Sequence, residues 1–215
     1  MSREIVVQGE AEATAAPNLA ELRVAVDWQG DTRESAYAEA ARAAAAVDEV
    51  IRAEEASIRK AVTAALVVQP RTRFRKGENV RTGWQAQRLS VLEVRALDRL
   101  GELVSLLVGA GANISGPRWG LDPTNEVHDR ARREAAADAR RRAAEYATAL
   151  GLELGPVAWI AEPGLRAGSG GGHRVGWRAA AGFARASAAE TDEPVEIAPG
   201  EITVTAAVEV GFEIA

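Results

Sequence analysis

The stretch EITVTAAVEVGFEI, residues 201–214, decides the fold. Apolar or small residues occupy every second position from Ile202 to Ile214, and most of the positions between them carry Glu or Thr. A repeat of two residues is typical of a β-strand with one buried face. A stripe of seven such positions at the C-terminal end predicts that the sheet is completed only when this strand docks.

The segment before this strand, residues 164–200, differs in composition. It is rich in Gly and Ala, and its part 164–189 carries four Arg but no Asp or Glu. Because a strand essential to the sheet follows it, we predict that the segment is a flexible insertion within one domain, residues 1–215, and not a linker to a second domain.

Strand patterns also open the chain. Residues 4–14 and 19–28 alternate in the same way, and the sequence AAPN between them has turn chemistry, which predicts a β-hairpin. Asp31, with Glu34 three residues later, predicts a capping box that opens a helix. Two further β-rich runs, residues 58–74 and 84–96, precede a helix opened by Asp98. A hairpin followed by a helix therefore occurs twice.

The longest predicted helix covers residues 123–150, with Asp122 as N-cap and Pro123 at the first helical position. Small residues recur along it at a spacing of four, which lets a helix lie close to a sheet or to another helix. Its other face carries Arg interleaved with Asp and Glu. The complete pattern predicts an α+β fold with antiparallel sheet, a long Ala- and Arg-rich third helix and a closing C-terminal strand.

Composition limits the chemistry. The 215 residues include 26 Lys and Arg against 31 Asp and Glu, a formal net charge of −5, and no Cys. Thiol nucleophiles, thiolate zinc sites and iron–sulfur clusters are therefore excluded. The single Met is Met1, so direct scavenging of oxidants is not credible.

Catalytic motifs are absent from the sequence. The two histidines, His128 and His173, do not form the H-x-x-x-H spacing of zinc hydrolases, and no G-x-S-x-G elbow occurs. The glycine-rich stretch at 168–174 lacks the Gly-Lys-Ser/Thr of a phosphate-binding loop. Neighbouring carboxylates such as Glu54 and Glu55 are typical of a solvated helix end. We predict no catalytic residue, no metal site and no cofactor.

The uncompensated Arg of the 164–189 segment are the candidate binding residues. Aromatic side chains lie among them, a mixture that could contact nucleic acid, an acidic protein or an anionic lipid surface. The acidic net charge makes nucleic acid the weakest of these alternatives. The candidate partner-contact residues are Arg166, Arg174, Trp177, Arg178, Phe183 and Arg185.

Four strings, in order, carry a resemblance to a known family. They are IVVQGEAEATAAPNLAELRVAV at 5–26, LDRLGELVSLLVGAGANISGPRWGLD at 97–122, ARREAAADARRRAAEYATALGLELGPVAWIAEPG at 131–164, and PVEIAPGEITVTAAVEVGFEI at 194–214. Together they resemble the SIMPL-domain proteins, which include bacterial periplasmic immunogenic and oxidative-stress-defence proteins. One departure is Gly83–Trp84, where the family usually has Gly-Tyr.

The resemblance implies an α+β domain, a tendency to form homo-oligomers and no established enzymatic activity. Envelope members of the family usually carry a signal peptide. Here Arg3 and Glu4 are followed at once by a strand pattern, so we expect no export signal and a cytoplasmic location. No stretch is long and apolar enough to predict a transmembrane segment.

Two functional hypotheses follow. In the first, the chain is a non-enzymatic protein that acts through homo-oligomeric assembly and has a stress-related role by resemblance. The Ala-lined helix, sheet edges available for pairing and the absence of a convergent polar triad favour it. In the second, the chain is a binding module for a partner protein or small ligand, and the 164–189 loop is its arm.

Overall fold

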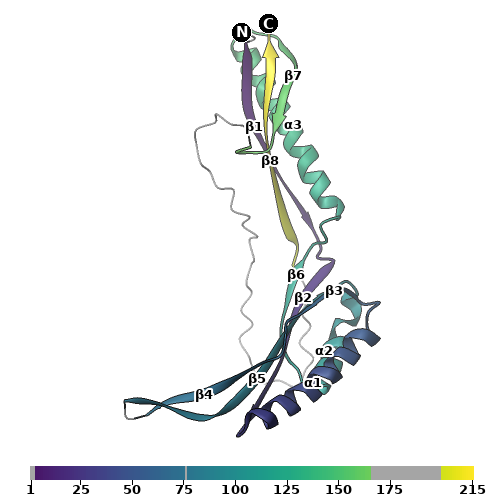
Figure 1. The fold of residues 1–215 in the computed structure, drawn as a ribbon. Coiled ribbons are helices and arrows are strands. Elements are labelled where there is room, and N and C mark those ends of the chain that lie inside the picture. The colour runs from purple at the N-terminus through teal and green to yellow at the C-terminus, as the bar shows by residue number, and fades with distance from the viewer. Residues whose placement is uncertain (1–2, 76, 166–199) are drawn as a thin grey trace. The chain divides into compact units, whose positions relative to one another are not determined.

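A computed structural model describes residues 3–75, 77–165 and 200–215, and it confirms the predicted α+β class with antiparallel sheets (Figure 1). The described residues form two compact units. Unit 1 takes its residues from Met1–Ala16 and Asp122–Ala215, and unit 2 is Pro17–Leu121. Unit 2 is therefore contiguous in sequence, whereas unit 1 is assembled from both ends of the chain.

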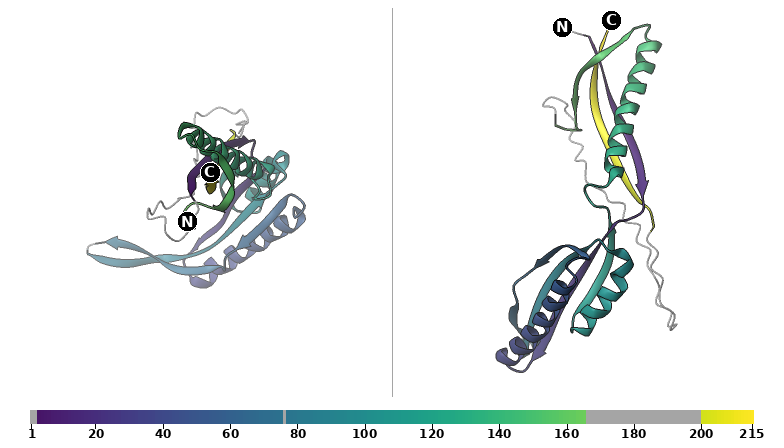
Figure 2. Two further views of the ribbon diagram at one scale, coloured as in Figure 1. Left: turned by 90° about the horizontal axis from the view of Figure 1, so that it is seen from above. Right: turned by 90° about the vertical axis from the view of Figure 1, so that its right-hand side faces the viewer.

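Unit 1 is a three-stranded sheet with one helix. The strand order is β1-β8-β7 and every pairing is antiparallel. The C-terminal strand completes this sheet, as predicted, and it does so from the central position, while α3 runs along one face (Figure 2). The elements are β1 (Glu4–Ala15), α3 (Glu126–Ala149), β7 (Leu154–Ala161) and β8 (Ile202–Ile214).

Close backbone approach holds α3 on this sheet. The row Ala131, Ala135, Ala139, Ala143 and Ala147 is at most 2% exposed. Opposite the row, β1 carries Gly9, and a Cβ built there would lie 2.1 Å from the carbonyl oxygen of Ala135. The Ala row is consequently occupied by the chain's own sheet and is not a free surface for assembly. Val7, Val210 and Phe212 complete this core.

Unit 2 is a larger sheet with two helices packed on one face (Figure 2). Its strand order is β3-β5-β2-β6, and β4 also pairs with β5. Leucines and valines fill the core, among them Leu22, Leu92, Leu103 and Leu107, each at most 1% exposed. The elements are β2 (Leu19–Gly30), α1 (Arg33–Ala53), β3 (Ile58–Thr63), β4 (Val67–Arg75), β5 (Glu78–Val94), the short 3₁₀ helix η1 (Leu97–Arg99), α2 (Leu100–Gly109) and β6 (Asn113–Gly120).

The ends of β4 and β5 leave the rest of this sheet as a two-stranded ribbon (Figure 1). We call residues 70–84, without residue 76, the β4–β5 arm. Val80 and Asn79 lie between the two predicted β-rich runs, yet they pair with Arg73 and Phe74 as in a regular ladder. Their side chains alternate between the two faces of the ribbon.

The first predicted hairpin is wrong in its pairing, although both strands exist. β1 pairs with β8 of unit 1, whereas β2 pairs with β5 and β6 of unit 2. The chain passes from unit 1 to unit 2 at Pro17, and the N–H of Asn18 donates to the carbonyl of Gly120 within unit 2. The apolar stripes of β1 and β2 are each buried more completely beside a distant strand than beside each other, and burial decides the pairing.

Helix starts differ from the predictions by one to three residues. Thr32 caps α1 and shares a reciprocal capping box with Ser35, in place of Asp31 and Glu34. Asn125 caps α3, and its side chain accepts the N–H of Val127, while Asp122 accepts the N–H of Thr124 in the preceding turn. All of these residue types cap helices well, so composition alone does not choose among them.

Candidate functional site

The six candidate partner-contact residues lie outside the described residues. They are Arg166, Arg174, Trp177, Arg178, Phe183 and Arg185. His173 lies in the same segment. Their role stays a prediction, and the candidate site has to be built from surfaces in the described parts of the two units.

His128 is in the first turn of α3. Its Nε2 atom is buried and has no hydrogen-bond partner among the described residues, although the side chain as a whole is half-buried. Across those same residues, no group of three or more His, Asp or Glu side chains is placed to hold a metal ion. A single imidazole without a carboxylate or hydroxyl partner does not form a catalytic constellation.

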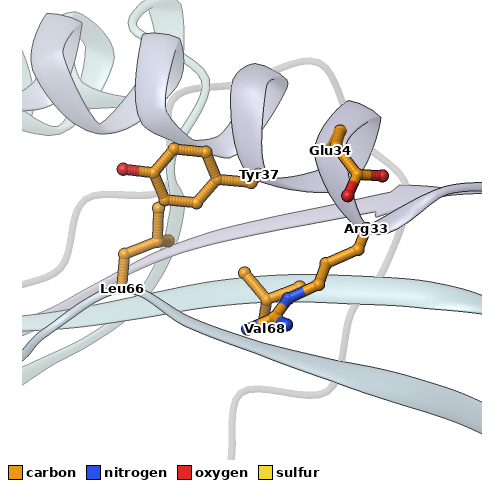
Figure 3. A pocket seen from close by; sticks show the side chains of 5 residues that line it. All are labelled: Arg33, Glu34, Tyr37, Leu66 and Val68. Carbon is orange, nitrogen blue, oxygen red and sulfur yellow. The ribbon is translucent and has the colours of Figure 1, made fainter.

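A hollow of about 400 Å³ lies between the start of α1 and β4 (Figure 3). Tyr37 of α1 lies above Leu66, and the side chain of Arg33 reaches toward Val68 of β4. Glu34 completes the lining. The hollow combines an apolar floor with one charge of each sign, and Tyr37 is 53% exposed. This open lining suits a side chain of a partner better than an enclosed ligand.

Trp84 marks the base of the β4–β5 arm. The guanidinium groups of Arg33 and Arg81 lie 5.9 and 5.5 Å from the centre of its ring, within the range of cation–π attraction. The ring of Trp84 thus contacts two cations, one from α1 and one from the arm itself.

The arm beyond Trp84 exposes both apolar and basic side chains. Phe74 is 70% exposed and Val80 is 45% exposed. Arg71 and Arg73 lie on the face that carries Val80, because alternate residues of a strand share a face. Within the described part of the chain, neither arginine forms an ion pair with a carboxylate. An exposed aromatic and unpaired guanidinium groups are typical of an interaction surface.

A second surface lies in unit 1, on the side of the sheet that α3 does not cover. Gly9 and its alternate neighbours point to α3, so the even-numbered residues of β1 point away. The register with β8 brings five carboxylates to this side, and we call it the acidic face: Glu4, Glu10, Glu12, Glu209 and Glu213. The described residues of β1 and β8 place no Lys or Arg among them.

Apolar side chains interrupt the acidic face. The indole of Trp159, from β7, lies over Gly211, where a Cβ would be 2.1 Å from its Nε1 atom. That nitrogen donates a 2.9 Å hydrogen bond to Glu4. Val6, which pairs with Gly211, is 58% exposed. A shape with acidic margins and an apolar centre suits a basic segment that carries apolar side chains of its own.

The outer strands carry features that discourage strand addition, in contrast to the expectation of available edges. Pro70, Pro117 and Pro156 interrupt β4, β6 and β7, and a proline cannot donate to a new ladder. On β1, the N–H of Glu10 donates to Asp138 of α3 at 3.1 Å. Contacts with other chains are therefore better served by side chains than by sheet extension.

The carboxylate of Asp138 accepts the hydrogen bond from the edge of β1. The backbone N–H of Glu10, helped by the guanidinium groups of Arg141 and Arg142, holds the pKa of this carboxyl below its usual range. Arg142 lies 2.7 Å from the carboxylate. The Arg-rich face of α3 thus serves its own unit, as its interleaved acidic residues predict.

The fold and these surfaces define an α+β protein with two antiparallel sheets and no assembled catalytic centre among the described residues. Residues 5–212 match the family model described as SIMPL, a protein of unknown function (DUF541). The chain therefore belongs to the SIMPL family, as the four sequence strings indicate.

Two relatives show the range of the family. The uncharacterized protein YggE of Escherichia coli K12 is 27% identical over 154 residues, which is 71% of this chain and 63% of YggE. The chain thus spans less than two thirds of that relative. The 26 kDa periplasmic immunogenic protein of Brucella melitensis is 28% identical over 219 residues, 98% of this chain and 84% of the relative.

The Brucella relative overturns the expected cytoplasmic location. That protein matches nearly the whole chain, and its name places it in the periplasm. The expectation rested on the absence of a recognisable leader before the first strand, and this criterion is weaker than full-length similarity. Among the described helices, none has the length and hydropathy to cross a membrane.

Sequence reasoning missed both the β4–β5 arm and the acidic face. A signal for the arm was present, since Arg71, Arg73 and Phe74 lie in a run that alternates like a strand. The acidic face had no local signal, because its two strands are about 200 residues apart and only their register brings the carboxylates together.

Proposed function

We propose that this SIMPL protein is a non-enzymatic component of the cell envelope that acts by assembling with copies of itself. The observation that carries the proposal is the β4–β5 arm. A two-stranded ribbon is marginally stable in water when no third strand or helix covers it. An arm that exposes Phe74 and Val80 gains stability when a partner covers it, and a second copy is the partner always present.

Protection from stress is part of this proposal. Because the chain has no Cys and only Met1, any protective role has to work by shielding or binding and not by reaction with oxidants. The Brucella relative's periplasmic name supports an envelope location. Cell fractionation of the native host tests that location, and recovery in the soluble cytoplasm alone would contradict it.

Light scattering coupled to size exclusion tests the assembly. We expect one discrete mass that is a multiple of 22.7 kDa. Replacing residues 71–82 by a two-residue turn should reduce the mass while circular dichroism stays close to that of the parent. A purified full-length chain that remains monomeric at high concentration would refute self-assembly.

The second candidate function is a binding module that uses residues 164–189. The four uncompensated Arg with Trp177 and Phe183 support it. Deletion of 164–189 separates the two functions. If the assembled mass is retained and capture of a partner is lost, the segment is a binding arm, whereas loss of the mass would make it part of the assembly interface.

A further inference from the structure

We infer that the β4–β5 arm of one chain docks on the acidic face of a second copy, so that the two copies contact each other head to tail. The inference rests on the proposed self-assembly and names the two surfaces that meet. It concerns described residues of both units and requires no statement about how the units of one chain are placed.

Charge complementarity is the first argument. The acidic face gathers Glu4, Glu10, Glu12, Glu209 and Glu213 with no basic residue of its strands among them. Glu10 and Glu12 on β1 and Glu209 on β8 lie on the same side of the sheet, and their like charges repel one another. A basic segment seated on this face would lower that repulsion.

The spacing of the charges is the second argument. Glu10 and Glu12 are two residues apart on one strand, and so are Arg71 and Arg73 on the arm. Both pairs therefore repeat at about 7 Å, the length of two extended residues. A strand laid over the sheet can place two guanidinium groups on two carboxylates at once.

Apolar complementarity is the third argument. Val80 lies on the face of the arm that carries Arg71 and Arg73, and Val6 and Trp159 form the apolar part of the acidic face. Burying them on docking removes apolar surface from water, which favours association independently of charge. The arm and the face also leave the protected sheet edges untouched.

Such a contact uses different surfaces on the two copies. Two copies that exchange arms satisfy both contacts in a closed dimer, whereas a contact made in one direction leaves one arm and one face free and continues to a ring or a filament. The mass of the assembly distinguishes these outcomes.

Charge reversal tests the docking in full-length chains. The arm variant R71E/R73E changes the net charge from −5 to −5 − 4 = −9, and the face variant E10R/E12R changes it to −5 + 4 = −1. We expect each to raise the concentration at half-assembly about tenfold or more, equivalent to about 1.4 kcal/mol. The chain that carries all four changes has the parental net charge and should regain most of the mass.

Matched controls separate specific docking from net charge. The double variant T72E/N79E adds negative charge to the opposite face of the same arm, where both positions are exposed, and should leave the mass nearly unchanged. Joining R71E/R73E with E55R/E134R restores the net charge at exposed sites of α1's end and of α3, and should not restore the mass. Equal loss with T72E/N79E, or rescue by E55R/E134R, would overturn the inference.

The outcomes also separate the two proposals. A parent chain that is monomeric refutes self-assembly and this docking with it. A parent that assembles, and whose mass responds to the arm variant but not to the face variant, keeps the proposed function and refutes the acidic face as the seat. If another segment of the same chain covers the acidic face, we likewise expect the mass to respond to the arm variant but not to the face variant.

Cross-linking supplies a measurement that does not depend on mass. Because the chain has no Cys, the double variant R73C/E12C carries two thiols only. Docking should yield disulfide-linked dimers and larger species under mild oxidation, since a disulfide forms only when the two Cβ atoms come within about 4.5 Å. The control R73C/E134C should remain largely unlinked, and equal linking of both variants would contradict the docking.

Discussion

The two units differ in how their helices pack against their sheets. In unit 1 the helix and sheet approach so closely at Gly9 that a Cβ there would collide with the backbone at Ala135 and Ala139. In unit 2 the space between sheet and helices is filled by Leu and Val, including Leu92 and Leu103. Unit 1 is stabilised by close contact between backbones, and unit 2 is stabilised by the packing of large side chains.

This difference implies opposite sensitivities. A core built on close approach has no room for added atoms, so enlargement should be the most damaging change in unit 1. A core built on large side chains loses contacts and leaves a cavity when one is shortened, so truncation should be the most damaging change in unit 2. The predictions below test this contrast, beginning with the largest effect.

Gly9→Val should abolish the packing of β1 on α3. Its Cβ would lie 2.1 Å from the carbonyl oxygen of Ala135 and 2.5 Å from the nitrogen of Ala139, and both obstacles are backbone atoms. Hydrogen exchange should show loss of protection throughout β1 and α3. The control Gln8→Val adds the same side chain to the exposed side of β1, and similar loss in both variants would contradict the close-approach account.

Leu92→Ala should destabilise unit 2 by about 3 kcal/mol, within the usual range for a leucine truncated in a core. Leu92 is fully buried on β5. Denaturant unfolding, followed by hydrogen exchange in β2 and α1, measures the loss. Leu89→Ala, on the same strand at a position that is 42% exposed, is the matched control and should change stability much less.

Arg88→Met should cost about 1–2 kcal/mol, because it removes charge-assisted bonds that join β5 to α1. Arg88 donates to both carboxylate oxygens of Asp48, at 2.9 and 2.7 Å, and to the carbonyl of Ala44. Urea unfolding measures the cost. Removing the exposed pair of Arg52 and Glu49 on α1 should give no measurable change, and an equal cost would show that burial is not the deciding factor.

Asp138→Asn should give the smallest effect, and the effect should depend on pH. The pKa of Asp138 is lowered in the folded chain, so its contribution to stability is present above the usual carboxyl pKa of 3.8 and is lost as the pH falls through the lowered value. The variant should thus be slightly less stable than the parent at pH 7, and this difference should be smaller at pH 2. A constant difference at both pH values would contradict the assignment.

Local patterns predicted the parts of the molecule that depend on local chemistry. The stripe of β8 and the Ala row of α3 are both found where the sequence places them. Pairing of β1 was not predictable in this way, because the turn chemistry at Pro17 suits a passage between units as well as a hairpin. A strand's partner is chosen by burial over the whole sheet, and a window of sequence does not contain that information.

The candidate surfaces follow the same rule. The cation–π contact of Arg33 with Trp84 joins residues 84 − 33 = 51 positions apart, and the acidic face joins strands from the two ends of the chain. The Arg-rich segment could be predicted as a candidate surface because its charges lie close together in sequence. A surface that forms only through the register of paired strands, in contrast, cannot be predicted until the pairing is known.

Along the sequence, unit 2 lies between β1 and α3, and this order has a consequence for folding. All strands and helices of unit 2 are contained in Pro17–Leu121, so on the ribosome this unit can fold before unit 1 has its last strand. Strand β1 emerges first but must wait for β8, nearly 190 residues later, to acquire its partner. Until then its apolar stripe is exposed, and the slow closure of this long loop should set the rate at which the native chain appears.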